Sequence, residues 1–387
     1  MQGNSLMKVR RTIWLICLPI IFAVQVSLAL SLIPSPPHIP GIKGYVLSDA
    51  NSQVVLASDH GHETIEPASL TKLMTLYVIF HALDQHQINM DDQVPISSHA
   101  AKTEGSKLFV RSGSKVPVKT LVDGIIIASG NDASVAMAEY VAGSEPGFVE
   151  LMNRAGEHLA LEKTHFQNAT GLPAKNHYST PLDLNRLATA IIQEFPDYYP
   201  LFKQRSIIYD KIKQNNRNRL LFNNSSVDGL KTGETKSAGF CLIASAKKND
   251  MRLISVIVGA PTDTERNQAS SRLLQYGFHF FKSIKIPAGS QATVPVRLSQ
   301  KSAVHAGFLT DQYVTIPYSI NAFKLPSIQW QKPLQAPLTE DQPIGNITLI
   351  YQGLPNQTLN VVAMEPVQAV TGWPKYWTQM IDWIKST

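Results

Sequence analysis

The sequence is poor in cysteine, with only two in 387 residues. Cys17 lies in an apolar N-terminal segment, and Cys241 lies in a β-prone run much further along the chain. If the apolar segment serves export, the exported part retains a single cysteine and cannot form an internal disulfide. We therefore expect Cys241 to be a core residue.

The sequence also lacks a basic run interleaved with aromatic residues. Its formal charge is +6, from 35 Lys and Arg against 29 Asp and Glu, but the basic residues are dispersed. This distribution predicts no nucleic-acid binding, although the excess positive charge suits contact with anionic surfaces. His60 and His62 have no third ligand close by, so we predict no metal site and no cofactor. With 44% hydrophobic and 17% charged residues, the chain can fold into two domains.

Residues 1–33 are typical of an export signal. Lys8, Arg10 and Arg11 precede an uncharged run from Thr12 to Ile33, and Ser27-Leu-Ala29 places small residues at a cleavage site. The run is longer than a usual signal core, so an uncleaved membrane anchor is the alternative. Either interpretation places the body of the protein outside the cytoplasm.

Ser69 and Lys72 are the first candidate catalytic pair. The segment Pro67-Ala-Ser-Leu-Thr-Lys72 opens a pattern with apolar residues at helical spacing, which predicts an amphipathic helix with Ser69 and Lys72 facing a common cleft. A serine hydroxyl becomes a nucleophile when a neighbouring neutral amine takes its proton. The same spacing occurs in a loop at Ser112-Gly-Ser-Lys115, and an N-cap serine with a solvated lysine is the structural alternative.

Two further short motifs suit a cleft. Ser129-Gly-Asn131 lies between two predicted helices, where its glycine would let the backbone bend sharply and present both polar side chains. Lys231-Thr-Gly233 lies on a predicted strand and offers a cation, a hydroxyl and room for a ligand backbone. Taken singly, the first could be an ordinary turn and the second a strand entry.

Together the three motifs resemble those of penicillin-binding proteins and serine β-lactamases, in the same order and on the same kinds of element. More closely, the chain resembles the low-molecular-mass D-alanyl-D-alanine carboxypeptidases of the penicillin-binding protein 5 type. The resemblance runs from about Gly41 to the C-terminus. It rests on Pro67-Ala-Ser-Leu-Thr-Lys-Leu-Met74, Ser129-Gly-Asn-Asp-Ala133, Asn168-Ala-Thr-Gly-Leu-Pro173, Asn216-Arg-Asn218, Val227-Asp-Gly229 and Lys231-Thr-Gly233.

The resemblance implies a serine peptidase that removes the terminal D-alanine from peptidoglycan pentapeptides and is acylated by β-lactam antibiotics. Ser69 would be the nucleophile, Lys72 its base and Ser129 the relay of a proton to the leaving amine. Asn131 would hold Lys72 and the substrate amide.

The resemblance also implies how the substrate is bound. Lys231, Thr232 and Gly233 would receive the terminal carboxylate, and Arg217 and Arg266 match family arginines near it. The backbone N–H groups of Ser69 and Glu234 would form the oxyanion hole. Relatives carry histidine or another residue at position 234, where a carboxylate at the rim could repel an anionic substrate.

We expect an α/β (α+β) fold of the β-lactamase/transpeptidase type, with an antiparallel sheet and a helical block over residues 34–285. Short β-prone runs then indicate a small β-sandwich domain over 286–369. Residues 370–387 form the last unit, in which Trp373 to Lys385 places Trp373, Trp377, Met380, Ile381 and Ile384 on one helical face. Such a helix predicts attachment to the periplasmic face of the cytoplasmic membrane, with docking on the β-domain as the alternative.

Two other functions use the same features. A β-lactamase shares the three motifs but normally adds a dedicated deacylation base and has no β-rich tail domain. A non-catalytic peptidoglycan-binding envelope protein would have no need of an intact motif set.

Overall fold

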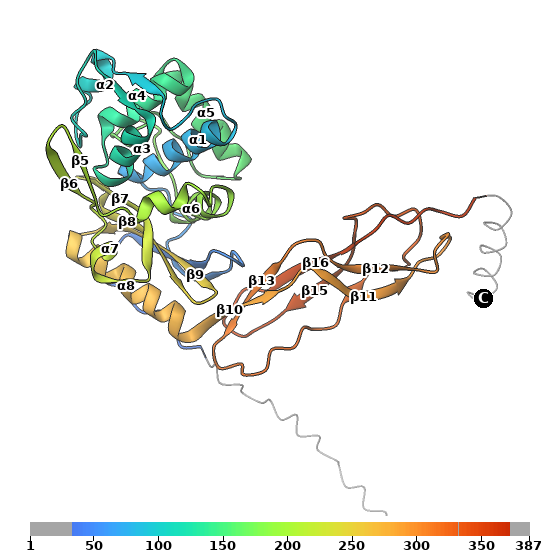
Figure 1. The fold of residues 1–387 in the computed structure, drawn as a ribbon. Helices are drawn as coiled ribbons and strands as arrows, with labels where there is room; N and C mark the ends of the chain where they lie inside the picture. The colour runs from blue at the N-terminus through green and yellow to red at the C-terminus, as the bar shows by residue number, and fades with distance from the viewer. Residues whose placement is uncertain (1–32, 332, 372–387) are drawn as a thin grey trace, which may run out of the picture.

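The computed structural model describes residues 33–331 and 333–371. The predicted export signal before Ile33 and the predicted tail helix, Trp373 to Lys385, lie outside the described residues. Within these ranges the chain forms an α/β body, residues 33–280, and an all-β body from residue 281 onward (Figure 1). No helix of the described part is both long and apolar enough to cross a membrane.

The α/β body is built on a five-stranded antiparallel sheet with strand order β2-β1-β9-β8-β7. The two long central strands are apolar over most of their length because both faces of the sheet are covered, and Cys241 is buried in β8 as expected. The strands are β1 (Gly44–Asp49), β2 (Val55–Asp59), β7 (Val227–Thr235), β8 (Gly239–Lys248) and β9 (Met251–Ala260).

Helices cover the two faces of this sheet. The long helix α8 (Asp263–Phe280) packs on β8 and β9 from one side, and α6 (Pro181–Glu194) packs on β1 and β9 from the other, beneath the rest of the helical block (Figure 1). Helix α6 begins with a capping residue, since the Thr180 hydroxyl accepts a hydrogen bond from the N–H of Asp183. The block contains α1 (Lys72–Asp84), α2 (Ser98–Lys102), α3 (Val118–Ile127), α4 (Asn131–Ala142) and α5 (Glu145–His158).

Helix α1 is not amphipathic, so that sequence prediction was wrong. Eleven of its residues are buried, and only His81 and Asp84 are exposed. The helix runs through the centre of the block in contact with α3, α4, α5 and α6, so most of its surface meets another element. Lys72 is consequently placed in the core at its first turn.

Several smaller elements complete the α/β body. Two small two-stranded antiparallel sheets and three short helical segments flank the block and the main sheet: β3 (Gln93–Pro95) with β4 (Lys115–Pro117), β5 (Ser206–Tyr209) with β6 (Ile212–Asn215), the 3₁₀ helices η1 (Ala68–Thr71) and η2 (Tyr199–Lys203), and α7 (Leu220–Asn223).

The all-β body continues directly from α8. Strand β10 (Phe281–Ile286) begins at the residue after the last residue of α8, spans the predicted domain boundary, and pairs with β13 (Gln312–Pro317). Asp49 at the end of β1 accepts hydrogen bonds from the hydroxyls of Ser283 and Thr315, which ties the two bodies together. The other strands form a sheet of order β11-β12-β16-β15-β14: β11 (Gly289–Pro295), β12 (Ala303–Phe308), β14 (Gln329–Trp330), β15 (Pro343–Leu349) and β16 (Gln357–Ala363).

Candidate active site

Ser69 and Lys72 meet where η1 passes into α1. The Nζ of Lys72 lies 3.0 Å from the Oγ of Ser69, and the lysine side chain has no solvent exposure. Ser69 is half-buried at the surface of a cleft. The turn in which η1 passes into α1 therefore places the Ser69 hydroxyl at the surface of the cleft, with the Lys72 amine directly behind it.

The amine of Lys72 has two further partners. It donates to the Oδ1 of Asn131 at 2.6 Å and to the carbonyl oxygen of Thr170 at 2.5 Å. Burial, followed by the positive charge of Arg217, lowers the pKa of Lys72 to about 7, against an opposing effect of Asp132. A large neutral fraction near pH 7 can accept the proton of the Ser69 hydroxyl.

The Thr170 carbonyl was not among the sequence-predicted site groups. It lies in a turn organised by Asn168, whose Oδ1 accepts from the N–H groups of Thr170 and Gly171. A Cβ at Gly171, which has a φ of +83°, would lie 1.8 Å from the carbonyl oxygen of Ala68, so only glycine permits this approach to η1. The pattern Asn-x-x-Gly was visible in the sequence, but its contact was not.

Ser129 and Lys231 form a second pair across the cleft. The Nζ of Lys231 donates to the Oγ of Ser129 at 3.0 Å and to the carbonyl oxygen of Thr232 at 2.8 Å. Both side chains are almost completely buried. Burial lowers the pKa of Lys231 well below its ordinary value, and the cations of Lys72, Arg217 and Arg266 lower it further.

The bend at Ser129-Gly-Asn131 differs from the prediction. The residue in the left-handed region is Ser129, with a φ of +57°, whereas Gly130 has an ordinary φ of −62°. Gly130 is needed for space instead, since an added Cβ would lie 3.0 Å from the Oδ1 of Asp132 and 3.1 Å from the N of Leu108. The conformation of Ser129 aims its hydroxyl at Lys231 and is one that a non-glycine residue adopts at a cost of about 1–3 kcal/mol.

Gly233 also lets two elements of the site pack closely together. A Cβ on this residue would meet the backbone N of Leu70 at 3.2 Å and the carbonyl oxygen of Pro67 at 3.3 Å. Its small size therefore lets strand β7 pack against η1, and so sets the distance between the Lys231 motif and Ser69.

Asp132 holds the loop on the other wall of the cleft. Its carboxylate accepts hydrogen bonds from the backbone N–H groups of Leu108, Phe109 and Val110 at 2.8, 2.7 and 3.1 Å. The same loop is joined to α4 by the N–H of Asn131, which donates to the carbonyl of Ser106. The sequence had singled out none of these loop residues.

These elements enclose a cleft of about 410 Å³. Arg217 is exposed at its edge, and Glu234 is exposed at its rim. Arg266 is buried and paired with Asp263, and its guanidinium lies over the ring of Phe240. The predicted residues that line the cleft are Ser69, Ser129, Arg217, Thr232, Gly233, Glu234 and Arg266, together with Gly105 and Ser106; Lys72, Asn131 and Lys231 stand behind them.

The sheet packed between α8 and a helical block, with two serine–lysine pairs facing one cleft, defines the class of serine acyl-transfer enzymes with the β-lactamase/transpeptidase fold. Residues 33–262 match the sequence model of the D-alanyl-D-alanine carboxypeptidase family, and residues 281–369 match that of the penicillin-binding protein 5 C-terminal domain. The chain belongs to the D-alanyl-D-alanine carboxypeptidase family and is a peptidase.

Individual relatives agree with this assignment. The chain is 38% identical over 345 residues to the D-alanyl-D-alanine carboxypeptidase DacC of Escherichia coli, covering 87% of this chain and 86% of the relative. The crystal structure of penicillin-binding protein 5 from Haemophilus influenzae superposes with a TM-score of 0.82 at 36% identity, covering 87% of this chain and 99% of that one. An ampicillin-bound structure of penicillin-binding protein D2 from Listeria monocytogenes gives a TM-score of 0.56 at 26% identity, covering 63% of this chain and all of that one.

Proposed function

We propose that this peptidase removes the terminal D-alanine from peptidoglycan pentapeptides through an acyl-enzyme on Ser69. The observation that carries the proposal is the 3.0 Å contact between the buried amine of Lys72 and the Ser69 hydroxyl. As the Oγ of Ser69 bonds to the carbonyl carbon of the penultimate D-alanine, its proton passes to Lys72. The bond to the last D-alanine then breaks, and water later releases the tetrapeptide.

The second pair supplies the proton for the leaving group. Ser129 Oγ, held by Lys231 at 3.0 Å, relays a proton to the departing amine of D-alanine. Asn131 orients Lys72 through its Oδ1, while its Nδ2 donates to the carbonyl of Glu104 at 2.6 Å and retains a second N–H for the substrate amide.

Recognition of the substrate carboxylate is assigned to the cationic side of the cleft. Lys231, Thr232 and Gly233 receive the carboxylate, with Arg217 and Arg266 adding positive charge from the lining of the cleft. An anion bound there favours the protonated form of Lys231, opposing the lowering of its pKa by burial and by the neighbouring cations. The backbone N–H groups of Ser69 and Glu234 are proposed as the oxyanion hole, because both residues border the cleft.

The same nucleophile accounts for covalent binding of β-lactams, whose reactive amide mimics the D-Ala-D-Ala bond.

We further propose that residues 1–33 export the chain, that residues 34–285 and 286–369 form the catalytic and β-domains, and that residues 370–387 hold the enzyme on the periplasmic face of the cytoplasmic membrane. The amphipathic pattern from Trp373 to Lys385 supports this last step.

A direct assay tests the activity. The protein is incubated with a pentapeptide ending in D-Ala-D-Ala, and free D-alanine is measured, with the Ser69→Ala variant as the control. Release by the unaltered protein and none by the variant supports the proposal; equal release by both contradicts it. Slow turnover of benzylpenicillin in a parallel assay distinguishes a carboxypeptidase from a β-lactamase, which would hydrolyse the antibiotic rapidly.

A further inference from the structure

A row of hollows follows α8 away from the cleft. Arg266 lines the cleft, and the next hollow, of about 400 Å³, is lined by Arg219 and by Arg272 of α8. Arg219 and Arg266 both pair with the carboxylate of Asp263, so this residue links the two hollows. The row of hollows therefore begins beside the active-site cleft.

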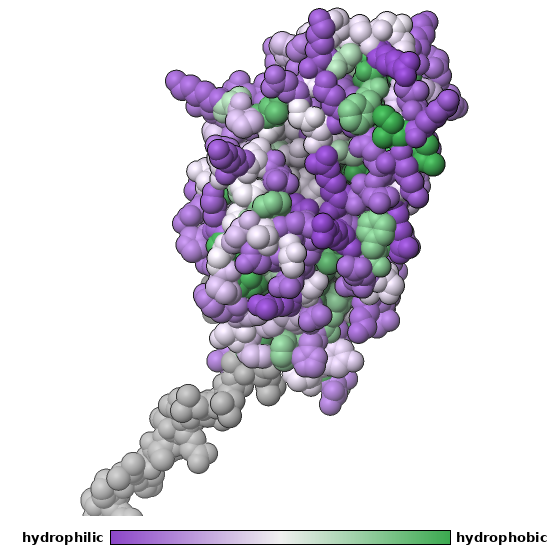
Figure 2. All heavy atoms as spheres, turned by 90° about the vertical axis from the view of Figure 1, so that its left-hand side faces the viewer, coloured by the Kyte–Doolittle hydropathy of each residue, from purple (hydrophilic) through white to green (hydrophobic). Residues whose placement is uncertain are grey.

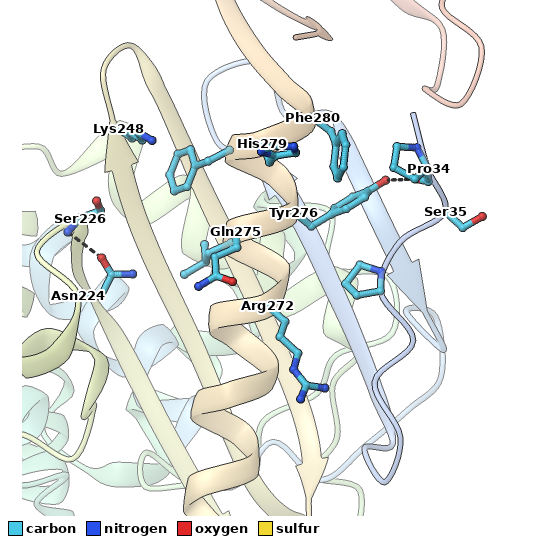
Figure 3. A pocket seen from close by; sticks show the side chains of 13 residues that line it. Pro34, Ser35, Asn224, Ser226, Lys248, Arg272, Gln275, Tyr276, His279 and Phe280 are labelled. Atoms are coloured by element: carbon cyan, nitrogen blue, oxygen red, sulfur yellow. Dashed lines mark hydrogen bonds between the residues drawn. The ribbon is translucent and has the colours of Figure 1, made fainter. Parts of the chain in front are cut away.

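The row continues to the junction of the two bodies. Arg272 and Gln275 also line a larger hollow of about 850 Å³, which reaches His279 on α8 and Lys248 at the end of β8 (Figure 3). A last hollow of about 550 Å³ shares Lys248 and His279 and extends into the all-β body. Arg272 and His279 lie 6 and 13 residues beyond Arg266, which corresponds to about 9 Å and about 20 Å along the helix.

The charge of this row is predominantly positive. Lys248 and Arg272 are exposed and form no ion pair with any residue that the structure describes. The large hollow has no carboxylate in its lining, and the last one has a single acidic residue, Asp250, beside Lys248 and Lys282. Unpaired cations held at intervals along a groove attract a ligand with repeated negative charges.

Aromatic side chains accompany the cations. Tyr276, Phe278 and Phe280 contribute to the large hollow, and the hydroxyl of Tyr276 donates to the carbonyl of Pro34, which fixes the N-terminal segment along its edge (Figure 3). The side of the molecule on which β5, β6 and the start of α8 lie is mostly hydrophilic, with scattered apolar residues (Figure 2). Cations with aromatic side chains among them, as in the large hollow, suit a polar polymer with flat apolar faces better than an apolar protein partner.

We propose that this row of hollows, from Arg219 to Lys282 along α8, is a binding track for a peptidoglycan strand. The inference rests on the proposed function: while the cleft holds one peptide stem, the track binds sugar rings and the free carboxylates of neighbouring stems on the same strand. A lipid headgroup has the same negative charge but does not offer carboxylates and sugar rings repeated over this length.

The test compares two matched double variants of the full chain. Lys248→Gln with Arg272→Gln removes the two unpaired cations of the track without touching the catalytic residues, and Lys203→Gln with Lys324→Gln removes two exposed lysines elsewhere. Co-sedimentation with purified, lipid-free peptidoglycan sacculi is measured at low and high salt, alongside binding to phosphatidylglycerol liposomes and the rate of D-alanine release from free pentapeptide.

The track variant should bind sacculi roughly tenfold more weakly at low salt, with unchanged hydrolysis of free pentapeptide and an unchanged melting temperature. The control variant should bind like the unaltered protein. Equal binding by both variants, or loss of liposome binding with sacculus binding intact, overturns the proposal. A protein that binds sacculi but releases no D-alanine would instead refute the proposed function, so the two failures are distinguishable.

Discussion

The side-chain oxygen of Asn131 accepts a 2.6 Å hydrogen bond from the amine of Lys72, which belongs to a different helix. With the Thr170 carbonyl as a second acceptor, this contact directs the amine toward Ser69. Because acceptors of this kind stabilise the protonated form, the lowered pKa of Lys72 reflects the dominance of burial.

The first prediction concerns pH. The pKa of Lys72 is lowered to about 7, and the neutral amine is the base, so acylation should be slow in acid and rise with pH until it levels off above about 7. Below the pKa the rate should fall about tenfold for each pH unit. Stopped-flow acylation by a fluorescent penicillin measures this profile. Lys72→Arg should be almost inactive at every pH, since a guanidinium keeps its proton; near-normal acylation in that variant would remove Lys72 as the base.

The second prediction concerns the site of covalent attachment. A labelled penicillin should modify Ser69 and leave Ser112 unmodified, because Ser69 has the buried amine of Lys72 beside it whereas Ser112 is exposed. Mass-spectrometric peptide mapping identifies the labelled residue. Label on Ser112, or no label at all, would disprove the assignment of the nucleophile.

The third prediction concerns the packing of β7 on η1. In Gly233→Ala the new methyl group would press on Leu70 and Pro67 and displace Lys231 and Thr232 relative to Ser69. Acylation should slow on the order of a hundredfold, as expected for a misplacement of about 1 Å. Gly156→Ala is the matched control, because its only close neighbour is 3.9 Å away and alanine favours its helix. Comparable slowing in both variants would show that the close approach at Gly233 is unimportant.

The fourth prediction concerns the loop held by Asp132. Asp132→Asn keeps one oxygen but replaces the other with an N–H group, which cannot accept the hydrogen bonds from Phe109 and Val110. The variant should lose about 1–3 kcal/mol in the free energy of unfolding and should acylate more slowly. Urea unfolding measures the loss, with Asp91→Asn at an exposed position as the control. Unaltered stability would mean that the loop is held by other contacts.

The fifth prediction concerns the C-terminal segment. Deleting Gly372 to Thr387 from a chain that already lacks the N-terminal signal should leave pentapeptide hydrolysis in solution nearly unchanged and abolish co-sedimentation with anionic liposomes. The undeleted chain provides the comparison. If the shortened protein still sediments with the liposomes, or if it unfolds, the segment is not the membrane anchor.

Features that depend on residues close together in the sequence could be predicted. Ser69 and Lys72 lie three residues apart, so one turn brings them together, and the strands β8 and β9 follow from their apolar runs. Helix α8 was not predicted, although Thr262 and Glu265 form a capping pair at its start and are three residues apart in the sequence.

Contacts set by the tertiary fold could not be predicted in this way. The Thr170 carbonyl becomes a partner of Lys72 only because its turn packs on η1, and periodicity could not show that α1 is covered by four other helices. The bend at Ser129 was assigned to Gly130 because glycine is the usual left-handed residue, whereas the fold uses that glycine for space.

The passage from α8 into β10 has a mechanical consequence. Phe280 ends the helix and Phe281 begins the strand, with no linker between them, and Asp49 fastens β1 to Ser283 and Thr315 beside the joint. We therefore expect the all-β body to keep a fixed orientation relative to the α/β body. The distance between the cleft and the far end of the all-β body would then be set by the length of its strands, so an enzyme attached by that end would act on substrates at one distance from the point of attachment.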